Sequence, residues 1–422
     1  MEVKTRAPGK IILSGEHAVV HGSTAVASSI DLYTFVSLRI ATPSDDQDSL
    51  KLHLKDMALE FSWPISRIRE AFPESATVLS SMPTSCSMES ARAIAALVEE
   101  LNIPEANFGL APGISAFLWL YSSIQGYKPA TVVVSSELPL GSGLGSSAAF
   151  CVALAAALLA FTDSVLVDVN HQGWLSFGVK DLDLVNKWAF EGEKMLHGKP
   201  SGIDNTVSTY GNIISFKSGN LTHMKSTMSL KMLITNTKVG RNTKALVAGV
   251  SERMLRHSDA MAFVFSAVDS ISKELTAIIQ SPTPDELSVT EKEAKIEELM
   301  EMNQGLLQSM GVSHATIETV LRTTLKYKLS SKLTGAGGGG CVLTLLPTFH
   351  SVEGEPWCNV LLLHCGLEEV LGSNTAKKPF RLWVLSGTVV DKVIAELESC
   401  GFQCFTAGVG GKGVEISFVV PS

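Results

Sequence analysis

Short apolar runs and stretches of helical apolar spacing alternate along the chain. Residues 131–134 are a β-branched run that predicts a strand, and residues 232–234 and 342–346 predict two more. Residues 181–197 have apolar positions at helical spacing, and Gly198 directly after them predicts the end of that helix. This mixture of strands and helices predicts an α+β protein.

The most apolar stretch, residues 148–161, is rich in alanine and follows a glycine-rich loop. It is shorter than the roughly 18 residues that a membrane-spanning helix needs, so it predicts a buried helix instead. Ser146 and Ser147 precede it, and because serine is a favoured N-cap they mark the start of the helix. Residues 243–280 and 291–310 predict further helices.

A chain of 422 residues, 45% hydrophobic and 18% charged, is long enough for two globular domains. Residues 218–229 are polar and contain glycine, so we expect a boundary near residue 225. The predicted domains are therefore residues 1–225 and 226–422.

The net charge of −8 argues against a general surface for nucleic acid or for anionic membranes. Seven cysteines, an odd number without close pairs, indicate a reducing compartment. The first residues have no apolar core of a secretion signal, and the last have no peroxisomal or lipidation signal. These features predict a cytoplasmic protein.

The glycine-rich loop, residues 141–147, reads Gly-Ser-Gly-Leu-Gly-Ser-Ser and lies between a predicted strand and a predicted helix. Glycines allow backbone N–H groups to approach an anion, and a helix N-terminus attracts one, so the loop indicates a diphosphate site. The alternative is a turn without a ligand. A Walker A loop would need a lysine here, and a dinucleotide fingerprint would need glycine in place of Ser146.

Two further segments are rich in glycine. Residues 332–341 contain four consecutive glycines, and the strand predicted directly after them favours an ordered loop over a flexible one. Residues 6–22 contain Lys10, which is flanked by Pro-Gly and by Ile-Ile-Leu. This context predicts a lysine held in a buried turn, where it serves an anionic partner.

Two carboxylates complete the set of candidate catalytic groups. Glu193 falls on a predicted helix, and Asp204 falls on a predicted loop after it. Each alone is more often a solvated charge. Beside a phosphate loop, one carboxylate can hold Mg²⁺ and the other can orient or deprotonate an attacking hydroxyl.

The three glycine-rich segments, in this order, resemble the GHMP kinase family, the kinases of galactose, homoserine, mevalonate and phosphomevalonate. The segment Ser-Gly-Glu-His-Ala-Val-Val-His-Gly at residues 14–22 is most similar to the branch that acts on mevalonate, in its animal form. The resemblance covers residues 4–346 and resumes over 389–414. It implies a two-domain α+β fold that binds nucleotide and acceptor in the cleft between the domains.

The resemblance also implies roles for individual residues. Lys10 is similar to the lysine that contacts the acceptor hydroxyl and the transferring phosphate, and Asp204 to the residue that takes the proton. Glu193 and Ser147 correspond to the Mg²⁺ ligands, and Asp56 stands where the family often has asparagine near adenine. The expected ATP-binding residues are Lys10, Ser136, Gly141, Ser142, Gly143, Leu144, Gly145, Ser146 and Ser147. The expected residues of the acceptor pocket are Glu16, His17, Ser201 and Thr243, with a buried core histidine an equal alternative for His17.

The implied reaction is ATP- and Mg²⁺-dependent phosphorylation of the 5-hydroxyl of (R)-mevalonate, in isoprenoid and sterol biosynthesis. The resemblance further implies a homodimer and inhibition by downstream prenyl diphosphates. The alternatives are another small-molecule kinase of this family or a catalytically silent nucleotide-binding paralogue. The presence of Lys10, Glu193 and Asp204 together favours an enzyme.

One segment departs from the family pattern. The family passes almost directly from the strand before Pro347 to a helix like residues 391–397, whereas here residues 348–387 intervene. A loop so long and apolar is unusual in a compact domain. The interpretation that we favour is a retained non-coding stretch or splice variant. The alternatives are a lineage-specific insertion and a partner-binding element. We expect an intact active site and a destabilised C-terminal domain.

Overall fold

The computed structural model describes residues 2–42, 47–72, 80–169, 171–240, 242–347 and 387–419. The expected insertion at residues 348–387 lies outside this part of the chain, except for Gly387 at the start of the last helix. The elements of the first half are β1 (Glu2–Ser14), η1 (Ala18–His21), β2 (Ala25–Ile40), β3 (Ser49–Leu54), η2 (Lys55–Met57), β4 (Leu59–Pro64), α1 (Ile65–Ala71), α2 (Met88–Glu99), η3 (Glu105–Leu110), α3 (Ala111–Gln125), β5 (Ala130–Ser136), α4 (Ser146–Leu159), β6 (Leu175–Ser176), α5 (Val179–His197) and α6 (Ile203–Tyr210). The remaining elements are β7 (Ile213–Lys217), β8 (Asn220–Met224), β9 (Leu230–Asn236), α7 (Thr243–Arg256), α8 (Ser258–Gln280), α9 (Glu286–Met310), α10 (Ala315–Lys326), β10 (Ser331–Leu333), β11 (Cys341–Leu346), α11 (Gly387–Ser399), β12 (Gln403–Val409) and β13 (Glu415–Val419).

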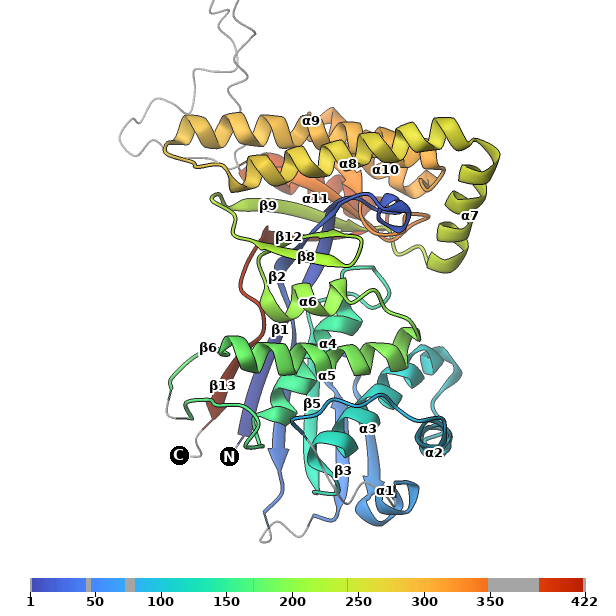
Figure 1. The fold of residues 1–422 in the computed structure, drawn as a ribbon, viewed down its shortest axis with the longest axis vertical. Coiled ribbons are helices and arrows are strands. Elements are labelled where there is room, and N and C mark those ends of the chain that lie inside the picture. Colours follow the sequence, from blue (N-terminus) through green and yellow to red (C-terminus); the bar gives the residue numbers. More distant parts are fainter. Residues whose placement is uncertain are drawn as a thin grey trace, which may run out of the picture.

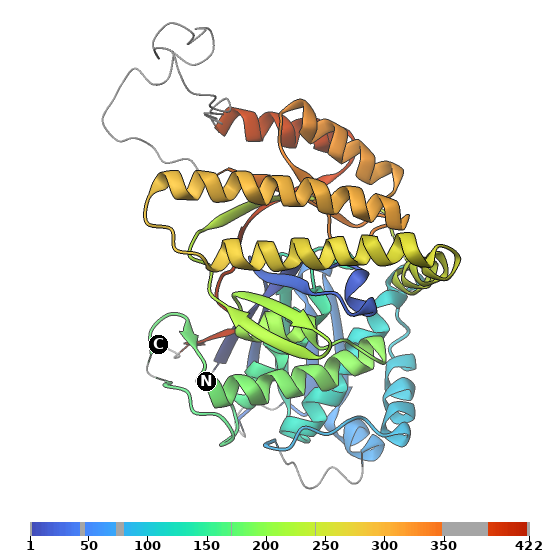
Figure 2. The same ribbon diagram turned by 45° about the horizontal axis from the view of Figure 1, so that its top comes forward.

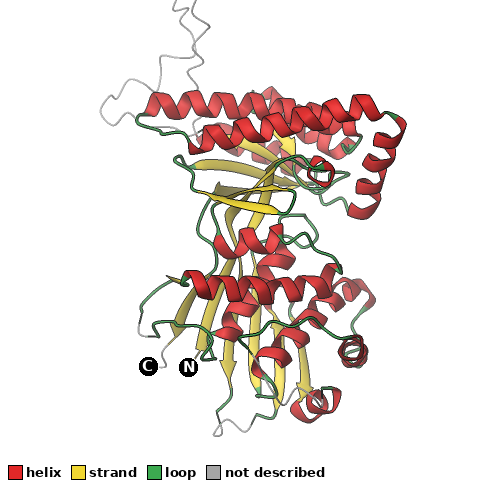
Figure 3. Ribbon diagram, in the orientation of Figure 1, coloured by secondary structure: helices red, strands yellow, loops and turns green. Residues whose placement is uncertain are grey.

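A single network of paired strands runs through the molecule, in the order β10-β11-β9-β12-β2-β1-β13-β6 along its main path. β1 and β2 are its longest strands and pair antiparallel from Glu2↔Arg39 to Ser14↔Val26. Helices α7 to α11 gather at one end of the molecule, and α3 to α6 lie against the strands at the other (Figures 1 and 3). The view in Figure 2 shows α8 and α9 side by side. The expected α+β architecture is confirmed.

The last strands return to the first part of the chain. β12 pairs with β9 and, at Val409, with β2, whereas β13 pairs with β1 and β6. Glu2 pairs with Val419, so the first and last described residues lie close together (Figure 1). A boundary near residue 225 stays a prediction, and hydrogen bonds between β1 and β13 connect the two sides of it.

Helix α4 is the buried, alanine-rich helix that the apolar stretch predicts. Alanine side chains need little space, and those of Ala153, Ala155, Ala156 and Ala157 are all fully buried. The N-cap differs from the prediction, because Gly145 occupies that position with φ 74° and no side chain caps the helix. In the described part of the chain, no helix is long and apolar enough to cross a membrane.

The other predicted elements are largely confirmed. The expected strands correspond to β5, β9 and β11, and the expected helices to α5 and α9. The segment predicted to be helical at residues 243–280 is divided at His257 into α7 and α8. Two expectations are wrong: Lys10 is buried in strand β1 rather than in a turn, because its backbone pairs with β2, and Asp204 lies in the first turn of α6 rather than in a loop.

Candidate active site

Strand β1 and helix α6 bring together the two predicted catalytic residues, Lys10 and Asp204. Lys10 Nζ lies 3.2 Å from Asp204 Oδ1. The lysine side chain is 7% exposed and the carboxylate is 36% exposed. The ammonium is therefore fixed in the protein while the carboxylate still faces an opening, as a group that receives a proton from a ligand must.

The glycine-rich loop packs directly on Lys10. The Lys10 backbone N–H donates to the Leu144 carbonyl at 2.8 Å. Gly145 has φ +74°, and a Cβ at this position would lie 2.8 Å from Lys10 Cγ. Only glycine permits this approach without displacing the lysine, so the loop and Lys10 form one unit. Within the loop, the Ser142 hydroxyl donates to the Pro139 carbonyl at 2.7 Å.

Close packing of α5 on α4 places Glu193 beside the start of α4. A Cβ at Gly192 would lie 2.8 Å from Cys151 Sγ, so glycine allows the two helices to approach. Glu193 is 2% exposed. Burial, and then the negative charge of Asp204, raise the pKa of Glu193 to about 7, although a hydrogen bond from Ser147 and the charge of Lys10 act in the opposite direction.

The oxygen atoms of Glu193 and Ser147 are a suitable donor set for Mg²⁺, which prefers hard oxygen ligands. Glu193 Oε1 is buried and accepts no hydrogen bond from the described residues, so it retains its capacity to bind a cation. Within the described ranges, no group of three or more His, Cys, Asp or Glu side chains is arranged to hold a metal. A Mg²⁺ ion here would therefore need further ligands from phosphate oxygens or water, as is usual for this ion.

His197 is a neighbour of this pair that the sequence analysis did not identify. Its Nε2 lies 3.1 Å from Ser147 Oγ and 3.9 Å from Glu193 Oε1. Glu193 and His197 are four residues apart in α5, so their side chains lie on the same face of the helix. That spacing was a signal that could have identified it.

A cavity of about 770 Å³ opens beside the glycine-rich loop. Apolar side chains dominate its lining, and Gly141, Ser146 and Ser147 of the glycine-rich loop also line it. Asp56 and Ser136 also line it, and Asp56 Oδ2 accepts a hydrogen bond of 2.6 Å from the Ser136 backbone N–H. A large apolar cavity with a few polar groups next to a glycine-rich loop has the size and lining to take a nucleobase.

Two of the four expected acceptor residues belong to a second, buried cluster. The Glu16 side chain is fully buried and forms an ion pair with Lys332, which also donates to the Leu333 carbonyl at 2.7 Å. His17 Nε2 lies 2.8 Å from the Ala336 carbonyl oxygen. Lys332 is the other functional candidate that the sequence analysis did not single out, because its partner is 316 residues away.

The other two expected acceptor residues, Ser201 and Thr243, are exposed. Ser201 precedes α6, and its hydroxyl accepts a hydrogen bond of 3.4 Å from the Ile203 backbone N–H. Thr243 is the first residue of α7, after the N-cap Asn242. The contacts of the described residues thus do not join these two with Glu16 in one cluster.

The run of glycines at residues 337–340 is ordered, as the sequence favoured, and it serves packing. A Cβ at Gly337 would lie 2.1 Å from the Val312 carbonyl oxygen, so only glycine fits. Just before the run, the Thr334 hydroxyl accepts from the Ile12 N–H at 2.9 Å and donates to the Ile12 carbonyl at 3.1 Å. The segment therefore fixes the end of β1, two residues beyond Lys10.

We expect Lys332→Met to destabilise the protein strongly. Burial lowers the pKa of Lys332, and the Glu16 carboxylate opposes this change by stabilising the ammonium form. Removal of the ammonium would leave Glu16 charged, buried and unpaired, at a cost of about 3–5 kcal/mol in the free energy of unfolding. Urea denaturation would measure it. The double variant Glu16→Gln/Lys332→Met should recover part of the loss, and a double variant no more stable than Lys332→Met would contradict this account.

The architecture and the site define a class of protein. The profile of the GHMP kinases N terminal domain matches residues 114–212, and that of the GHMP kinases C terminal matches residues 289–353. Two solved structures share the fold at a TM-score of 0.63: Methanococcus jannaschii mevalonate kinase, 20% identical, covering 96% of this chain and 97% of that one, and L. major mevalonate kinase in complex with R-mevalonate, 19% identical, covering 97% and 96%. The fold is that of a GHMP kinase.

Full-length relatives narrow this class. A mevalonate kinase of Arabidopsis thaliana is 61% identical over 99% of this chain and 100% of its own length. The human mevalonate kinase is 37% identical over 97% of this chain and 93% of its own. The chain belongs to the mevalonate kinase family. The expected likeness to the animal form is not borne out, because the plant relative is far more similar than the human one.

Proposed function

We propose that this protein transfers the γ-phosphoryl group of ATP to the 5-hydroxyl of (R)-mevalonate, giving 5-phosphomevalonate for isoprenoid and sterol biosynthesis. The observation that carries the proposal is the contact of Lys10 Nζ with Asp204 Oδ1, at 3.2 Å, directly against the glycine-rich loop. A carboxylate and an ammonium at this place can serve both the attacking hydroxyl and the transferring phosphate. The 61% identical mevalonate kinase of Arabidopsis supports the choice of acceptor.

In this reaction Asp204 accepts the proton of the mevalonate hydroxyl as the oxygen attacks phosphorus. The ammonium of Lys10 stabilises negative charge on the equatorial oxygens of the phosphoryl group in transfer. The buried position of Lys10 matters because an electrostatic contact is stronger away from bulk water. Catalysis of this kind depends mainly on position and charge, since the phosphoryl group needs little covalent assistance.

We propose that ATP lies with its phosphates along residues 141–147 and its base in the 770 Å³ cavity near Asp56 and Ser136. Exposed backbone N–H groups of the loop and of the first turn of α4 would bind phosphate oxygens. Glu193 and Ser147 would hold Mg²⁺, which supplies charge neutralisation on the phosphates when bound. The acceptor would approach from the side of Asp204, in the interdomain cleft that the family resemblance implies.

We further propose, on the family resemblance, a cytoplasmic homodimer that downstream prenyl diphosphates inhibit at the nucleotide site. The apolar lining of the cavity supports this last point, because it suits a prenyl chain next to a diphosphate-binding loop. Each point has its own test. Fractionation of cells would give the location, and sedimentation would give the state of assembly. Inhibition that is relieved by added ATP would place the inhibitor at the nucleotide site.

Turnover on a panel of acceptors tests the main proposal. The purified chain would be incubated with Mg²⁺-ATP and mevalonate, phosphomevalonate, galactose or homoserine, and ADP release would be followed. We expect rapid phosphorylation of mevalonate alone. Preference for another acceptor would assign a different kinase of the same class, and ATP binding without turnover on any acceptor would indicate a silent paralogue.

A further inference from the structure

The turn from residue 15 to residue 24 joins β1 to β2 and holds an unfavourable backbone conformation. His17 has φ 59°, in the left-handed region that residues with a side chain rarely adopt. Such a residue keeps this conformation only where its surroundings enforce it, and such positions cluster at functional sites. The turn carries Glu16 and His17, the two buried members of the expected acceptor set.

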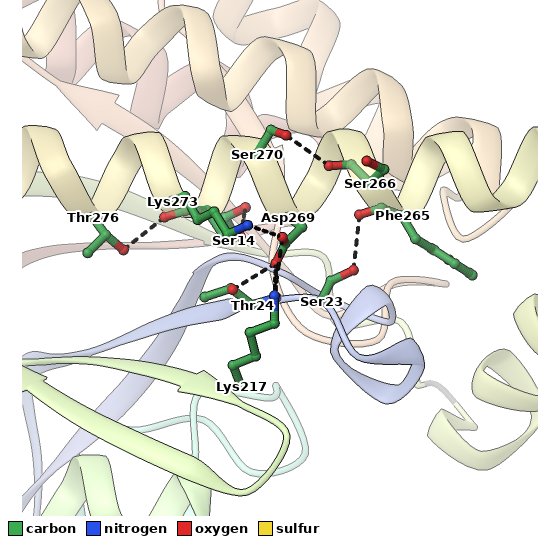
Figure 4. A network of polar contacts seen from close by, with 11 residues as sticks. Ser14, Ser23, Thr24, Lys217, Phe265, Ser266, Asp269, Ser270, Lys273 and Thr276 are labelled. Atoms are coloured by element: carbon green, nitrogen blue, oxygen red, sulfur yellow. Dashed lines mark hydrogen bonds and ion pairs between the residues drawn. The ribbon is translucent and has the colours of Figure 1, made fainter.

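Asp269 on α8 holds the far end of this turn (Figure 4). Its Oδ1 accepts two hydrogen bonds of 2.7 Å from Thr24, one from the backbone N–H and one from the hydroxyl. Lys217 Nζ lies 3.1 Å from the same oxygen, and Lys273 Nζ lies 2.7 Å from Oδ2. Partial burial raises the pKa of Asp269, but the hydrogen bonds from Lys273, Thr24 and Lys217 lower it by more. The pKa of Asp269 is therefore below its ordinary value.

The same face of α8 holds the rest of the turn. At the near end, the hydroxyl oxygens of Ser14 and Ser272 are 2.9 Å apart. The Ser23 hydroxyl donates to the Phe265 carbonyl at 3.0 Å (Figure 4). The His21 ring stacks on the Phe265 ring with centroids 4.4 Å apart. Positions 265, 269 and 272 are spaced by four and three residues, so they form one stripe along the helix.

Glu16 and His17 of the turn contact β10 and the segment that follows it. Glu16 forms its ion pair with Lys332, and His17 contacts the Ala336 carbonyl. The turn is therefore held between α8, which contacts both of its ends, and the glycine-rich segment, which contacts Glu16 and His17. Loss of the α8 contacts would free the end at Thr24 and allow the strained His17 to relax.

We propose that Asp269 is a positioning residue: through Thr24 it holds the turn of residues 15–24 so that Glu16 and His17 keep their places on the acceptor side of the site. This inference rests on the proposed function. The hydrogen bonds to Thr24 carry the effect, because Thr24 is 6% exposed. Lys217 and Lys273 are 46% and 63% exposed, and ion pairs of exposed side chains contribute little.

Substitution of Asp269 by alanine and by asparagine tests the proposal. Asp269→Ala should raise KM for mevalonate by about tenfold or more while KM for ATP stays within about twofold, since small misplacements have large kinetic effects. Asp269→Asn retains an acceptor oxygen for Thr24 and should stay within about threefold of the wild type in both constants. Ser270→Ala is the matched control, because that exposed hydroxyl donates to the Ser266 carbonyl of its own helix, at 3.1 Å, and not to the turn.

Hydrogen exchange followed by mass spectrometry gives a second measurement that does not depend on turnover. Amides of residues 15–24 should exchange faster in Asp269→Ala than in the wild type, and should stay protected in Asp269→Asn and Ser270→Ala. An unchanged KM for mevalonate with unchanged exchange in Asp269→Ala would overturn the inference. An asparagine variant as impaired as alanine would also overturn it, because the role would then belong to the ion pairs.

These measurements separate the two proposals. A wild type that phosphorylates some other acceptor, or none, refutes the proposed function by itself. In that case the exchange rates of residues 15–24 still decide whether Asp269 holds the turn.

Discussion

Asp204→Asn is expected to lower kcat with mevalonate by about 10²–10⁴-fold, the range that removal of a general base produces. The amide keeps the size of the side chain and can still contact Lys10, whose Nζ is 3.2 Å away, but it cannot take a proton. The loss should therefore appear in kcat, with little change in the affinity for ATP. Steady-state kinetics and a titration of ATP binding would measure the two effects.

Asp183→Asn is a suitable control for this variant. Asp183 is also a carboxylate paired with a lysine, Lys187 at 2.6 Å, but both side chains are more than half exposed on α5. Its substitution should leave kcat unchanged, since an exposed pair of this kind contributes little. If Asp204→Asn retained activity within about tenfold of the wild type, Asp204 could not be the proton acceptor.

Glu193→Gln is expected to make the metal-free protein more stable and at the same time nearly inactive. The pKa of Glu193 is raised from its ordinary value of 4.5 to about 7 by burial and by Asp204. Between these values the folded protein holds a proton that the unfolded chain releases, so wild-type stability falls as pH rises through this window. Glutamine cannot ionise, and it should therefore recover up to about 3 kcal/mol at pH 8.

Urea denaturation without Mg²⁺ at pH 8 and pH 5 would measure this difference, which should shrink to below about 1 kcal/mol at pH 5. Turnover with Mg²⁺-ATP should fall by about 10²-fold or more, because the carboxylate proposed to hold the metal is gone. Glu191→Gln, on the same helix, is the control: Glu191 pairs with Lys194 at 2.8 Å and should show neither effect. A Glu193 variant no more stable than wild type at pH 8 would refute the account.

The local elements were predictable because their causes are local. The β-branched run at residues 131–134 became part of β5, and the alanine-rich stretch became α4. The glycine-rich loop also lay where expected, between them. Two expectations failed: pairing with β2 extends β1 through Lys10, and Asp204 lies in the first turn of α6 rather than in a loop.

The environment of each site residue was less predictable than its identity. Glu16 and His17 were expected in the acceptor pocket, and their side chains are buried against Lys332 and Ala336. His197 was not predicted as a site residue, although it lies four residues after Glu193 in the sequence. Asp269 had no local signal, because its hydrogen bonds to Thr24 cross 245 residues of chain.

From the sequence alone we could predict β5, β9, β11, α4, α5 and α9, the place of the glycine-rich loop, and the residues whose side chains suit phosphate, metal and proton. Hydrophobic periodicity and the conformational freedom of glycine act over a few residues, so both can be recognised in a single sequence. The tertiary structure was needed to show that Lys10 meets Asp204, that Glu193 is buried near a second carboxylate, and that α8 holds the turn after β1. Burial and charge proximity depend on segments far apart in sequence, and these two quantities set the chemistry of the site.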